Sequence, residues 1–400
     1  MEVLIKNCRI IDETKDMIGD IYIKDGKIEN YGMDLDYGCK TIDALGLVVM
    51  PAFIDLHVHF REPGYTHKED IYTGSKAALK GGYTLVNLMA NTNPICSNME
   101  TVEYVLNKSK ELDLIDIHQA VSITTDFDGK TLDHLDRLDH RVKFISDDGK
   151  GVQSNLTMYR AMLKGKEKNL ILIGHEEDEE IVNIDNRLSE DIMTYRDLYL
   201  AKLTGARLHL AHVSTRNSVE EIRKAKKYGK NITCEVTPHH IGLYDNDYRV
   251  NPPIREKEDV DAIIQGIKDG TIDTIATDHA PHTIEDKKQG APGISGIETA
   301  FSICYTSLVK SGEISLNRLS QLMSATPGKI MNVNKGKIKK GYDGDLVFLD
   351  LDRKLSINSD EFISKGKNTV FNGMEVYGEV IGTMRMGQLK YNGGLKFDNR

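Results

Sequence analysis

Between residues 51 and 334, short apolar, β-rich runs alternate with longer segments whose apolar residues recur at helical spacing. The helix-like segments include KEDIYTGSKAALKGG and STRNSVEEIRKAKKYGK, and the second is expected to begin at an N-cap on Ser214 and to end near Gly229. Eight strands that alternate with helices predict a (β/α)8 barrel of the TIM type, whose usual length is ~250 residues. The eight runs are AFIDLHVHF, YTLVNLM, IDIHQAVSIT, RVKFISDD, NLILIGH, ARLHLAHVS, NITCEVT and DTIATDH.

A doubly wound parallel sheet is the main alternative for such an alternating pattern. That fold normally carries a glycine-rich dinucleotide turn between its first strand and helix. The sequence contains neither GxGxxG nor GxxxxGK[ST]. The barrel is therefore the expected fold.

The two ends of the chain have a different pattern. The first 50 residues contain the strand-like runs VLIKNCRII, DIYIKDGKIENYG and TIDALGLVVM, with a hairpin signal at Asp25-Gly26. The last part contains GKIKKGYDGDLVFLDL, TVFNG and a final strand-like stretch, EVIGTMRMGQLKYNG. Lone sheets of this size are marginally stable. We therefore expect residues 1–50 and 335–400 to form one small β-sandwich-like domain beside a barrel over 51–334.

Composition narrows the class of protein. The net charge of −9 over 400 residues argues against a nucleic-acid-binding surface, which needs a basic face. No run of 18 apolar residues occurs, and the first residues, MEVLIKNCRI, do not resemble a signal peptide. The cysteines are scattered and form no CxxC, which is typical of a reduced, cytoplasmic protein. Any metal must then be held by His, Asp or Glu. The five cysteines are Cys8, Cys39, Cys96, Cys234 and Cys304.

Histidines and aspartates recur where the apolar runs end. The carboxyl ends of parallel barrel strands meet at one mouth, so five runs are expected to deliver these side chains to the same rim. An isolated HxH pair is usually a hydrogen-bonded strand feature, but the convergence indicates a metal site. Four histidines and two aspartates are more ligands than one tetrahedral catalytic metal site can use. Two zinc-like ions that share a bridging carboxylate fit this number better. The residues are His57 and His59, Asp147 and Asp148, His175, His212, and Asp278.

Other histidines are expected to have lesser roles. His209, three residues before His212, is expected to point away from the mouth with a packing or surface role, and His279 is expected to point outward. His239 and His240 end the seventh run and are candidates to support the metal ligands.

Taken together, the motifs resemble the amidohydrolase superfamily of metal-dependent hydrolases and, within it, the dihydroorotases of the bacterial class I type. The similarity runs through the barrel and both ends. The motifs are specific as a set, although HxH and TDH alone occur across the superfamily. They are MPAFIDLHVHFREPGYTHKEDI (50–71), LMANTNP (88–94), ISDDGKGVQ (145–153), LAHVST (210–215), EVTPHH (235–240), NPPIR (251–255) and ATDHAPH (276–282).

The resemblance implies two zinc ions per subunit. Asp148 would bridge them, because its spacing of 27 residues to the next histidine matches the family's pattern. Many relatives use a carboxylated lysine as the bridge, so a carboxylated Lys143 is an alternative. The implied ligands are His57, His59 and Asp278 for one ion, His175 and His212 for the other, and Asp148 for both.

The resemblance also implies a reaction, the reversible cyclisation of N-carbamoyl-L-aspartate to L-dihydroorotate in pyrimidine biosynthesis. In the hydrolytic direction, the metals activate the attacking water, and Asp278 passes its proton to the leaving nitrogen. Arg61 would bind the unreactive substrate carboxylate, helped by Asn91 and His282, while Asn251 would contact the ring amide. From their motifs alone, Arg61 could be a surface cation and Asn91 a turn residue.

Two segments depart from the family's pattern. The loop 282–293 is shorter than usual and lacks the phenylalanine common after Pro292, so Pro292 and Gly293 are expected to supply the backbone contacts to the substrate carboxylate. The segment from His175 to His212 is also short, at 37 residues. This second difference changes the outer face of the barrel and bears on assembly.

Two other functions remain open at this point. Allantoinases and hydantoinases share the metal site but generally lack an arginine at the position of Arg61. A non-catalytic relative that only supports aspartate carbamoyltransferase is the second alternative, although every expected ligand is present here. We expect a homodimer that acts on a small molecule, without nucleic acid or membrane, and aspartate carbamoyltransferase is a possible partner.

Overall fold

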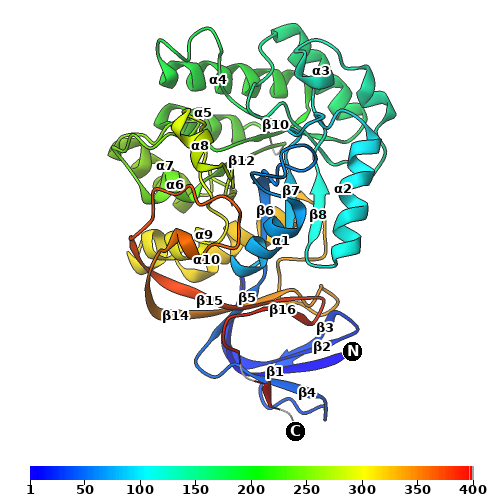
Figure 1. The fold of residues 1–400 in the computed structure, drawn as a ribbon, viewed down its shortest axis with the longest axis vertical. Helices are drawn as coiled ribbons and strands as arrows, with labels where there is room; N and C mark the ends of the chain where they lie inside the picture. Colours follow the sequence, from blue (N-terminus) through cyan, green and yellow to red (C-terminus); the bar gives the residue numbers. More distant parts are fainter. Residues whose placement is uncertain (230, 396, 399–400) are drawn as a thin grey trace.

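The computed structural model describes residues 1–229, 231–395 and 397–398, and strands from the middle of the chain lie in its upper part, surrounded by helices (Figure 1). Each of the eight runs predicted from the sequence contributes one strand. The strands are β6 (Phe53–Val58), β7 (Tyr83–Leu88), β8 (Asp116–Gln119), β9 (Phe144–Ile145), β10 (Ile171–Gly174), β11 (Arg207–Leu210), β12 (Ile232–Val236) and β13 (Thr274–Ile275).

The eight strands close into a barrel in two arcs. One arc runs β6–β7–β8 and the other β9 to β13, with every neighbouring pair parallel. Parallel bridges join the arcs, from Val121 to Ile145 and from Val58 to His279. The predicted (β/α)8 fold is thus confirmed, and the strands are buried, as parallel strands enclosed by helices require.

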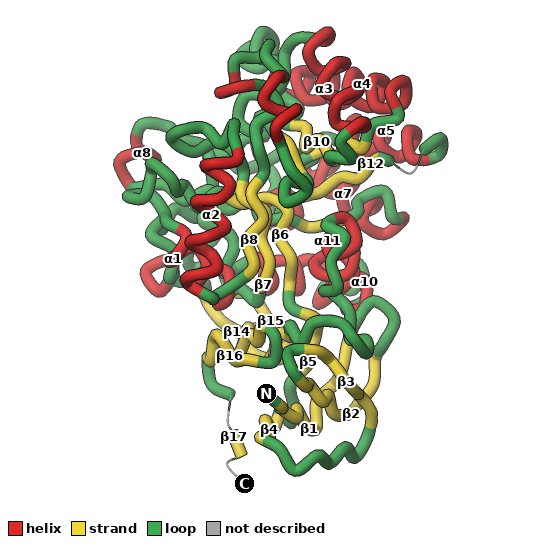
Figure 2. The backbone as a smooth tube through the Cα atoms, turned by 90° about the vertical axis from the view of Figure 1, so that its right-hand side faces the viewer, coloured by secondary structure: helices red, strands yellow, loops and turns green. Residues whose placement is uncertain are grey.

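Helices cover the outside of the barrel, and Figure 2 shows α1 and α2 outside β6, β7 and β8. The N-cap of α5 is Thr215, whose side chain accepts a hydrogen bond from Ser218 N–H, and the helix ends at Lys226. The expected N-cap at Ser214 is therefore wrong by one residue, because the Ser214 hydroxyl donates to Glu190 instead. The longer helices are α1 (Ile71–Lys80), α2 (Met99–Leu112), α3 (Asn155–Glu167), α4 (Asn186–Thr204), α5 (Arg216–Lys226) and α7 (Lys257–Asp269).

Shorter helical segments fill the connections. They are α6 (Pro238–Gly242), α8 (Ile284–Lys288), α9 (Ala300–Cys304), α10 (Leu316–Ser320) and α11 (Thr326–Ile330), the 3₁₀ turns η1 (Thr125–Phe127), η2 (Asp133–Arg137) and η5 (Ser359–Glu361), and the π turns η3 (Tyr305–Lys310) and η4 (Gln321–Ala325).

Strands from both ends of the chain form a second sheet below the barrel (Figure 1). The strand order is β16-β15-β14-β5-β1-β2-β3, and β4 pairs with β1 and with β17. The strands from the two ends of the chain are joined where residues 48–51 pair antiparallel with residues 346–349. The strands are β1 (Glu2–Ile11), β2 (Asp16–Lys24), β3 (Lys27–Gly32), β4 (Lys40–Asp43), β5 (Val48–Pro51), β14 (Leu346–Ser356), β15 (Glu375–Arg385), β16 (Gln388–Asn392) and β17 (Phe397–Asp398).

Two strand predictions at the carboxyl end are wrong. The run TVFNG is irregular, and the stretch 379–393 is not one strand but the hairpin β15–β16, which turns at Met386-Gly387 with φ values of 49° and 74°. The Asp25-Gly26 turn between β2 and β3 is confirmed, with φ values of 48° and 79°. The domain boundaries at residues 50 and 335 stay a prediction.

None of the helices within the described residues is long and apolar enough to cross a membrane.

Candidate metal and substrate site

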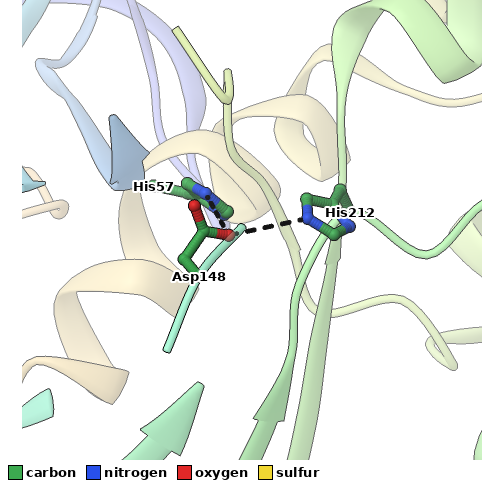
Figure 3. Close-up of side chains that lie close together, drawn as sticks. All are labelled: His57, Asp148 and His212. Atoms are coloured by element: carbon green, nitrogen blue, oxygen red, sulfur yellow. Dashed lines mark ion pairs between the residues drawn. The ribbon is translucent and has the colours of Figure 1, made fainter. Parts of the chain in front are cut away.

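Five barrel strands bring the predicted ligands together at their carboxyl ends. β6 supplies His57, and His59 follows it directly, while Asp148, His175, His212 and Asp278 each follow their strand within three residues. All six side chains are buried. Figure 3 shows Asp148 between His57 and His212, which approach it from different strands.

Asp148 is the centre of the cluster. Its Oδ1 atom lies 3.3 Å from His57 Nε2, 3.2 Å from His175 Nδ1 and 3.8 Å from His212 Nε2. Its Oδ2 atom lies 3.5 Å from His59 Nε2. Both carboxylate oxygens thus face imidazole nitrogens, which is the arrangement that a bridging ligand requires.

Asp278 holds one side of the cluster. Its Oδ1 atom lies 2.9 Å from His59 Nε2 and 3.6 Å from His57 Nε2. On the other side, His175 Nδ1 and His212 Nε2 are 3.0 Å apart. Two sets of ligand atoms lie within 4.8 Å of one another, His57 with His59 and Asp278, and His57 with Asp148 and His212.

A hydrogen bond on the far side of the His57 imidazole fixes which of its nitrogens faces the cluster. His57 Nδ1 lies 2.7 Å from Glu235 Oε1, and Glu235 Oε2 lies 2.9 Å from His209 Nε2. A carboxylate can only accept, so His57 Nδ1 carries a proton and a neutral ring leaves Nε2 free for an ion. The surface role considered for His209 is therefore wrong, and the buried packing role agrees with the structure, since His209 is fully buried and contacts the Glu235 carboxylate.

Asn91 holds two of the predicted ligands. Its Oδ1 atom lies 2.9 Å from His59 Nδ1, and its Nδ2 donates to Asp148 Oδ2 at 3.3 Å. This amide therefore directs the Nε2 atom of His59 towards Asp278. Asn91 also lines the cavity at the mouth.

The buried polar atoms of the cluster fit a bound cation. His57 Nε2 and Asp148 Oδ1 have no hydrogen-bond partner among the described residues, although both are buried. Burial alone lowers the pKa of His57, but the carboxylates of Asp148 and Glu235 outweigh it and raise that pKa well above its usual value. The carboxylates therefore favour a positive charge at His57 Nε2, and a divalent cation can supply that charge and satisfy both buried atoms. The donor set of imidazoles and carboxylates suits a borderline divalent ion.

The backbone is left-handed at two predicted metal ligands and at one predicted substrate-binding residue. Arg61, His212 and Asp278 have φ values of 60°, 31° and 46°, a region that non-glycine residues adopt at a cost. Asp55 secures the last of these turns, because its carboxylate accepts hydrogen bonds from Thr277 N–H (3.0 Å) and Oγ1 (2.6 Å). Such strain concentrates where the surrounding structure must hold a functional side chain in place.

A cavity of about 200 Å³ opens beside the cluster, and all six predicted substrate-binding residues line it. Arg61 lies between the Pro281 carbonyl, to which its Nε donates at 3.3 Å, and His282 Nε2, 3.2 Å from its Nη2. Burial, then the neighbouring Arg61, lowers the pKa of His282 to about 3, so His282 is neutral and accepts. The six residues are Arg61, Asn91, Asn251, His282, Pro292 and Gly293.

Two of these residues already have protein partners. Asn251 Nδ2 donates to Glu177 Oε2 at 2.6 Å, which leaves its carbonyl oxygen for a ligand. Gly293 N–H donates to the Arg249 carbonyl at 3.1 Å, and Pro292 has no N–H. A backbone contact from Gly293 to a substrate carboxylate would therefore require this hydrogen bond to be exchanged.

The alternative bridges lie elsewhere. Asp147 accepts hydrogen bonds from Ile123 N–H (2.6 Å) and Thr124 N–H (3.0 Å), so it anchors a loop rather than facing the cluster. Lys143 precedes β9, and its Nζ donates to the Met331 carbonyl at 2.5 Å in a cavity at the amino ends of the strands. A carboxylated Lys143 bridge is thus excluded by this arrangement, because the side chain lies at the opposite end of the strand.

Sequence reasoning missed Glu235 and Glu177 as supports of the site. Glu235 is a buried acidic residue in the β-rich run NITCEVT, and that was the available signal for it. Glu177 is half-buried beyond the end of β10, and no comparable signal pointed to it. His279 was expected to point outward, and this is wrong, since it is buried and its Nδ1 accepts from Gly296 N–H at 3.2 Å.

Comparison with known proteins gives one family and a consistent set of relatives. Residues 48–390 match the model of the amidohydrolase family. A protein from Clostridium botulinum named dihydroorotase is 56% identical over 396 residues, which cover 98% of this chain and 100% of the relative. One from Lactobacillus gasseri with the same name is 41% identical over 426 residues, covering 99% and 100%.

Solved structures agree on the architecture. An L-hydantoinase (dihydropyrimidinase) from Arthrobacter aurescens aligns with a TM-score of 0.89 at 26% identity, covering 98% of this chain and 96% of the other. A D-hydantoinase structure aligns with a TM-score of 0.89 at 25% identity, covering 99% and 97%.

Proposed function

The chain belongs to the amidohydrolase family, and we propose that its site catalyses the reversible cyclisation of N-carbamoyl-L-aspartate to L-dihydroorotate and water, a step of pyrimidine (UMP) biosynthesis. The protein is a hydrolase of cyclic amides, and its substrate is a small molecule. The observation that carries the choice of substrate is the position of Arg61, whose guanidinium lines the same cavity as the ligand cluster.

We propose that the cluster holds two zinc ions. The support is the geometry around Asp148, whose two oxygens face histidines from both sides. When bound, two such ions would lower the pKa of a water molecule towards neutrality and polarise the amide carbonyl. The expected ligands are His57, His59 and Asp278 for one ion, His175 and His212 for the other, and Asp148 for both.

Arg61 would orient the substrate. Its Nε and Nη2 are held by Pro281 and His282, while Nη1 donates to no group of the described residues. The outer edge of the guanidinium can therefore bind a carboxylate through two parallel hydrogen bonds. An arginine fixed in this way sets the ring against the cluster before reaction, which lowers the entropic part of the barrier.

Asp278 would move the proton. In hydrolysis, water adds to the ring carbonyl carbon, a C–O bond forms and the C–N bond breaks, so one proton must travel from the water to the departing nitrogen. The Asp278 carboxylate lines the cavity and lies at the cluster, where it can accept that proton and then donate it to the nitrogen. Asn251 would accept a hydrogen bond from the ring amide through its free carbonyl oxygen.

The function is tested by comparing three substrates on the zinc-loaded protein. We expect turnover of L-dihydroorotate with a kcat/KM at least about 100-fold above that of hydantoin or allantoin, since neither offers a carboxylate to Arg61. Hydrolysis of hydantoin or allantoin as the faster reaction would reassign the chain to those enzymes. If the protein turns over none of the three substrates although its metal content is verified, the remaining explanation is a non-catalytic protein that supports aspartate carbamoyltransferase.

We also propose that the enzyme is a cytoplasmic homodimer that pairs through α3 and α4. These neighbouring helices present eight large apolar side chains to solvent, among them Tyr195 (61% exposed) and Tyr199 (54% exposed). Each partner of a stable interface contributes about 800 Å², and a patch of large exposed side chains on two neighbouring helices suits such an interface. The side chains are Leu156, Tyr159, Leu163, Leu188, Ile192, Tyr195, Tyr199 and Leu203.

The spacing on α4 favours a second copy over an unrelated partner. Its exposed apolar residues, Leu188, Ile192, Tyr195, Tyr199 and Leu203, lie nearly symmetrically about the helix centre. An antiparallel copy related by a two-fold axis would therefore set Leu188 against Leu203 and Ile192 against Tyr199. Aspartate carbamoyltransferase is the alternative occupant of this face.

Tyr195→Asp should convert the dimer to a monomer, because it buries a charge at the two-fold axis. Light scattering coupled to size-exclusion chromatography measures the change. Tyr244→Asp is the matched control, since Tyr244 is similarly exposed (53%) but lies outside α3 and α4. A wild-type monomer, or a dimer that survives Tyr195→Asp, would contradict the proposed interface.

A further inference from the structure

A second large cavity lies at the amino ends of β9, β10 and β11, away from the ligand cluster. Its volume is about 630 Å³. Lys143, which directly precedes β9, and Ile171 and Arg207, the first residues of β10 and β11, lie on its wall. A neighbouring cavity of about 530 Å³ shares Ile171, Arg207, Lys329 and Ile330 with it. Small-molecule sites in proteins typically measure ~300–1,000 Å³.

The wall of this cavity is cationic in a protein whose net charge is −9. Four cationic side chains line it, Lys143, Lys168, Arg207 and Lys329. The lining carboxylate is Asp139, which already pairs with Arg141. Among the described residues, none of the four cations has a carboxylate within salt-bridge distance; Lys143 and Lys168 donate to backbone carbonyls of Met331 and Asp136.

A buried lysine elsewhere in the protein, Lys335, is neutralised by carboxylates, in contrast to the cations of this wall. Lys335 contacts Asp116 at 2.8 Å, Asp343 at 3.0 Å and Asp345 at 2.6 Å. At the cavity, burial lowers the pKa of Lys143 and of Arg207, and no nearby carboxylate offsets it. Partly desolvated cations without a counter-charge are unfavourable, so an anion from solution would gain binding energy here.

Apolar residues complete the wall. Val142, Ile171, Ile330 and Met331 line the same cavity as the cations. A purely inorganic anion would leave this apolar surface without a partner, whereas an organic group would cover it. A bound molecule therefore needs both a strongly anionic end and an uncharged body.

We propose that this cavity binds an organic phosphate of about nucleotide size, whose phosphate lies against Arg207 and Lys329. The guanidinium of Arg207 suits two phosphate oxygens, and the ammonium of Lys329 adds a point charge. The site lies at the end of the barrel opposite the ligand cluster, so its occupation does not compete with substrate for Arg61.

Calorimetric titration of the zinc-loaded protein tests the proposal, with inorganic phosphate, pyrophosphate, AMP and UMP as probes. We expect a nucleotide to bind at least 10-fold more tightly than inorganic phosphate, with one site per chain, and equally in the Arg61→Ala variant. Nucleotide binding that disappears in Arg61→Ala would assign the anion to the substrate cavity and overturn the proposal. A nucleotide affinity no greater than that of inorganic phosphate would overturn the proposal that the ligand is organic.

Two variants locate the site. Arg207→Ala and Lys329→Ala should each weaken the nucleotide at least about 10-fold, while kcat for the chain's own substrate stays unchanged. Lys329 is exposed, so its variant should fold even where Arg207→Ala does not. Lys110→Ala removes the same charge from an exposed position on α2 and should bind as the wild type does. Unchanged affinity in Lys329→Ala would contradict the site.

Discussion

Replacing Asp278 with asparagine should lower kcat for dihydroorotate hydrolysis by about 10³-fold, within the range of roughly 10²–10⁴ that a positioned proton-transfer group supplies. Asparagine keeps the shape of the side chain but cannot take up a proton. It also tolerates the left-handed backbone at this position, where φ is 46°, so the fold should be preserved. The amide oxygen still faces His59 and His57, from which Asp278 Oδ1 lies 2.9 and 3.6 Å.

The measurement must separate proton transfer from metal loss. Steady-state kinetics with saturating zinc, together with the metal content of the dialysed protein, accomplish this. Asp34→Asn is the matched control, because Asp34 is another left-handed aspartate (φ 53°) but is exposed near the terminal sheet. A kcat near the wild-type value in metal-loaded Asp278→Asn would remove the acid–base role and leave Asp278 as a ligand.

The barrel could be predicted because its signal is local and repeated. Each strand is a short apolar run that ends in a polar residue, and the parallel arrangement follows from the intervening helices. The position of His57, His175, His212 and Asp278 at strand ends therefore sufficed to bring them together. No contact between distant residues had to be known in advance.

The supports of the site could not be predicted, because they depend on such contacts. His57 and Glu235 are 178 residues apart in the sequence and meet at 2.7 Å inside the barrel. His209 looked as though it faced away from His212, yet the interior of the barrel receives both side chains. Spacing along one strand predicts which side of the strand a residue faces. It does not predict which side chain from another strand the residue contacts inside a closed barrel.

The terminal sheet shows the same limit. The strand-like character of both ends was evident, but the pairing of Val48–Pro51 with residues 346–349 joins segments almost 300 residues apart. The hairpin at Met386-Gly387 was missed because methionine is not a typical turn residue, and only glycine signalled the reversal. Because apolar residues alternate on both sides of the turn, the pattern predicted one continuous strand.

Replacing Arg61 with alanine should lower kcat/KM for dihydroorotate by about 10²- to 10³-fold, or roughly 3–4 kcal/mol, with the zinc content unchanged. The loss has two sources, since the substrate carboxylate loses its partner and the ring loses its orientation against the cluster. Arg61 contacts Pro281 and His282 but none of the ligand nitrogens, so the metal site should survive.

Arg61→Lys separates charge from geometry. Lysine keeps the positive charge but cannot form two parallel hydrogen bonds, so activity should fall between those of the wild type and Arg61→Ala. The left-handed backbone at residue 61 (φ 60°) is equally strained for arginine, lysine and alanine, because all three carry a Cβ atom. Differences among them therefore report on the guanidinium. Turnover of dihydroorotate by Arg61→Ala at the wild-type rate would show that another group binds the carboxylate, and Arg61 would no longer distinguish this site from that of a hydantoinase.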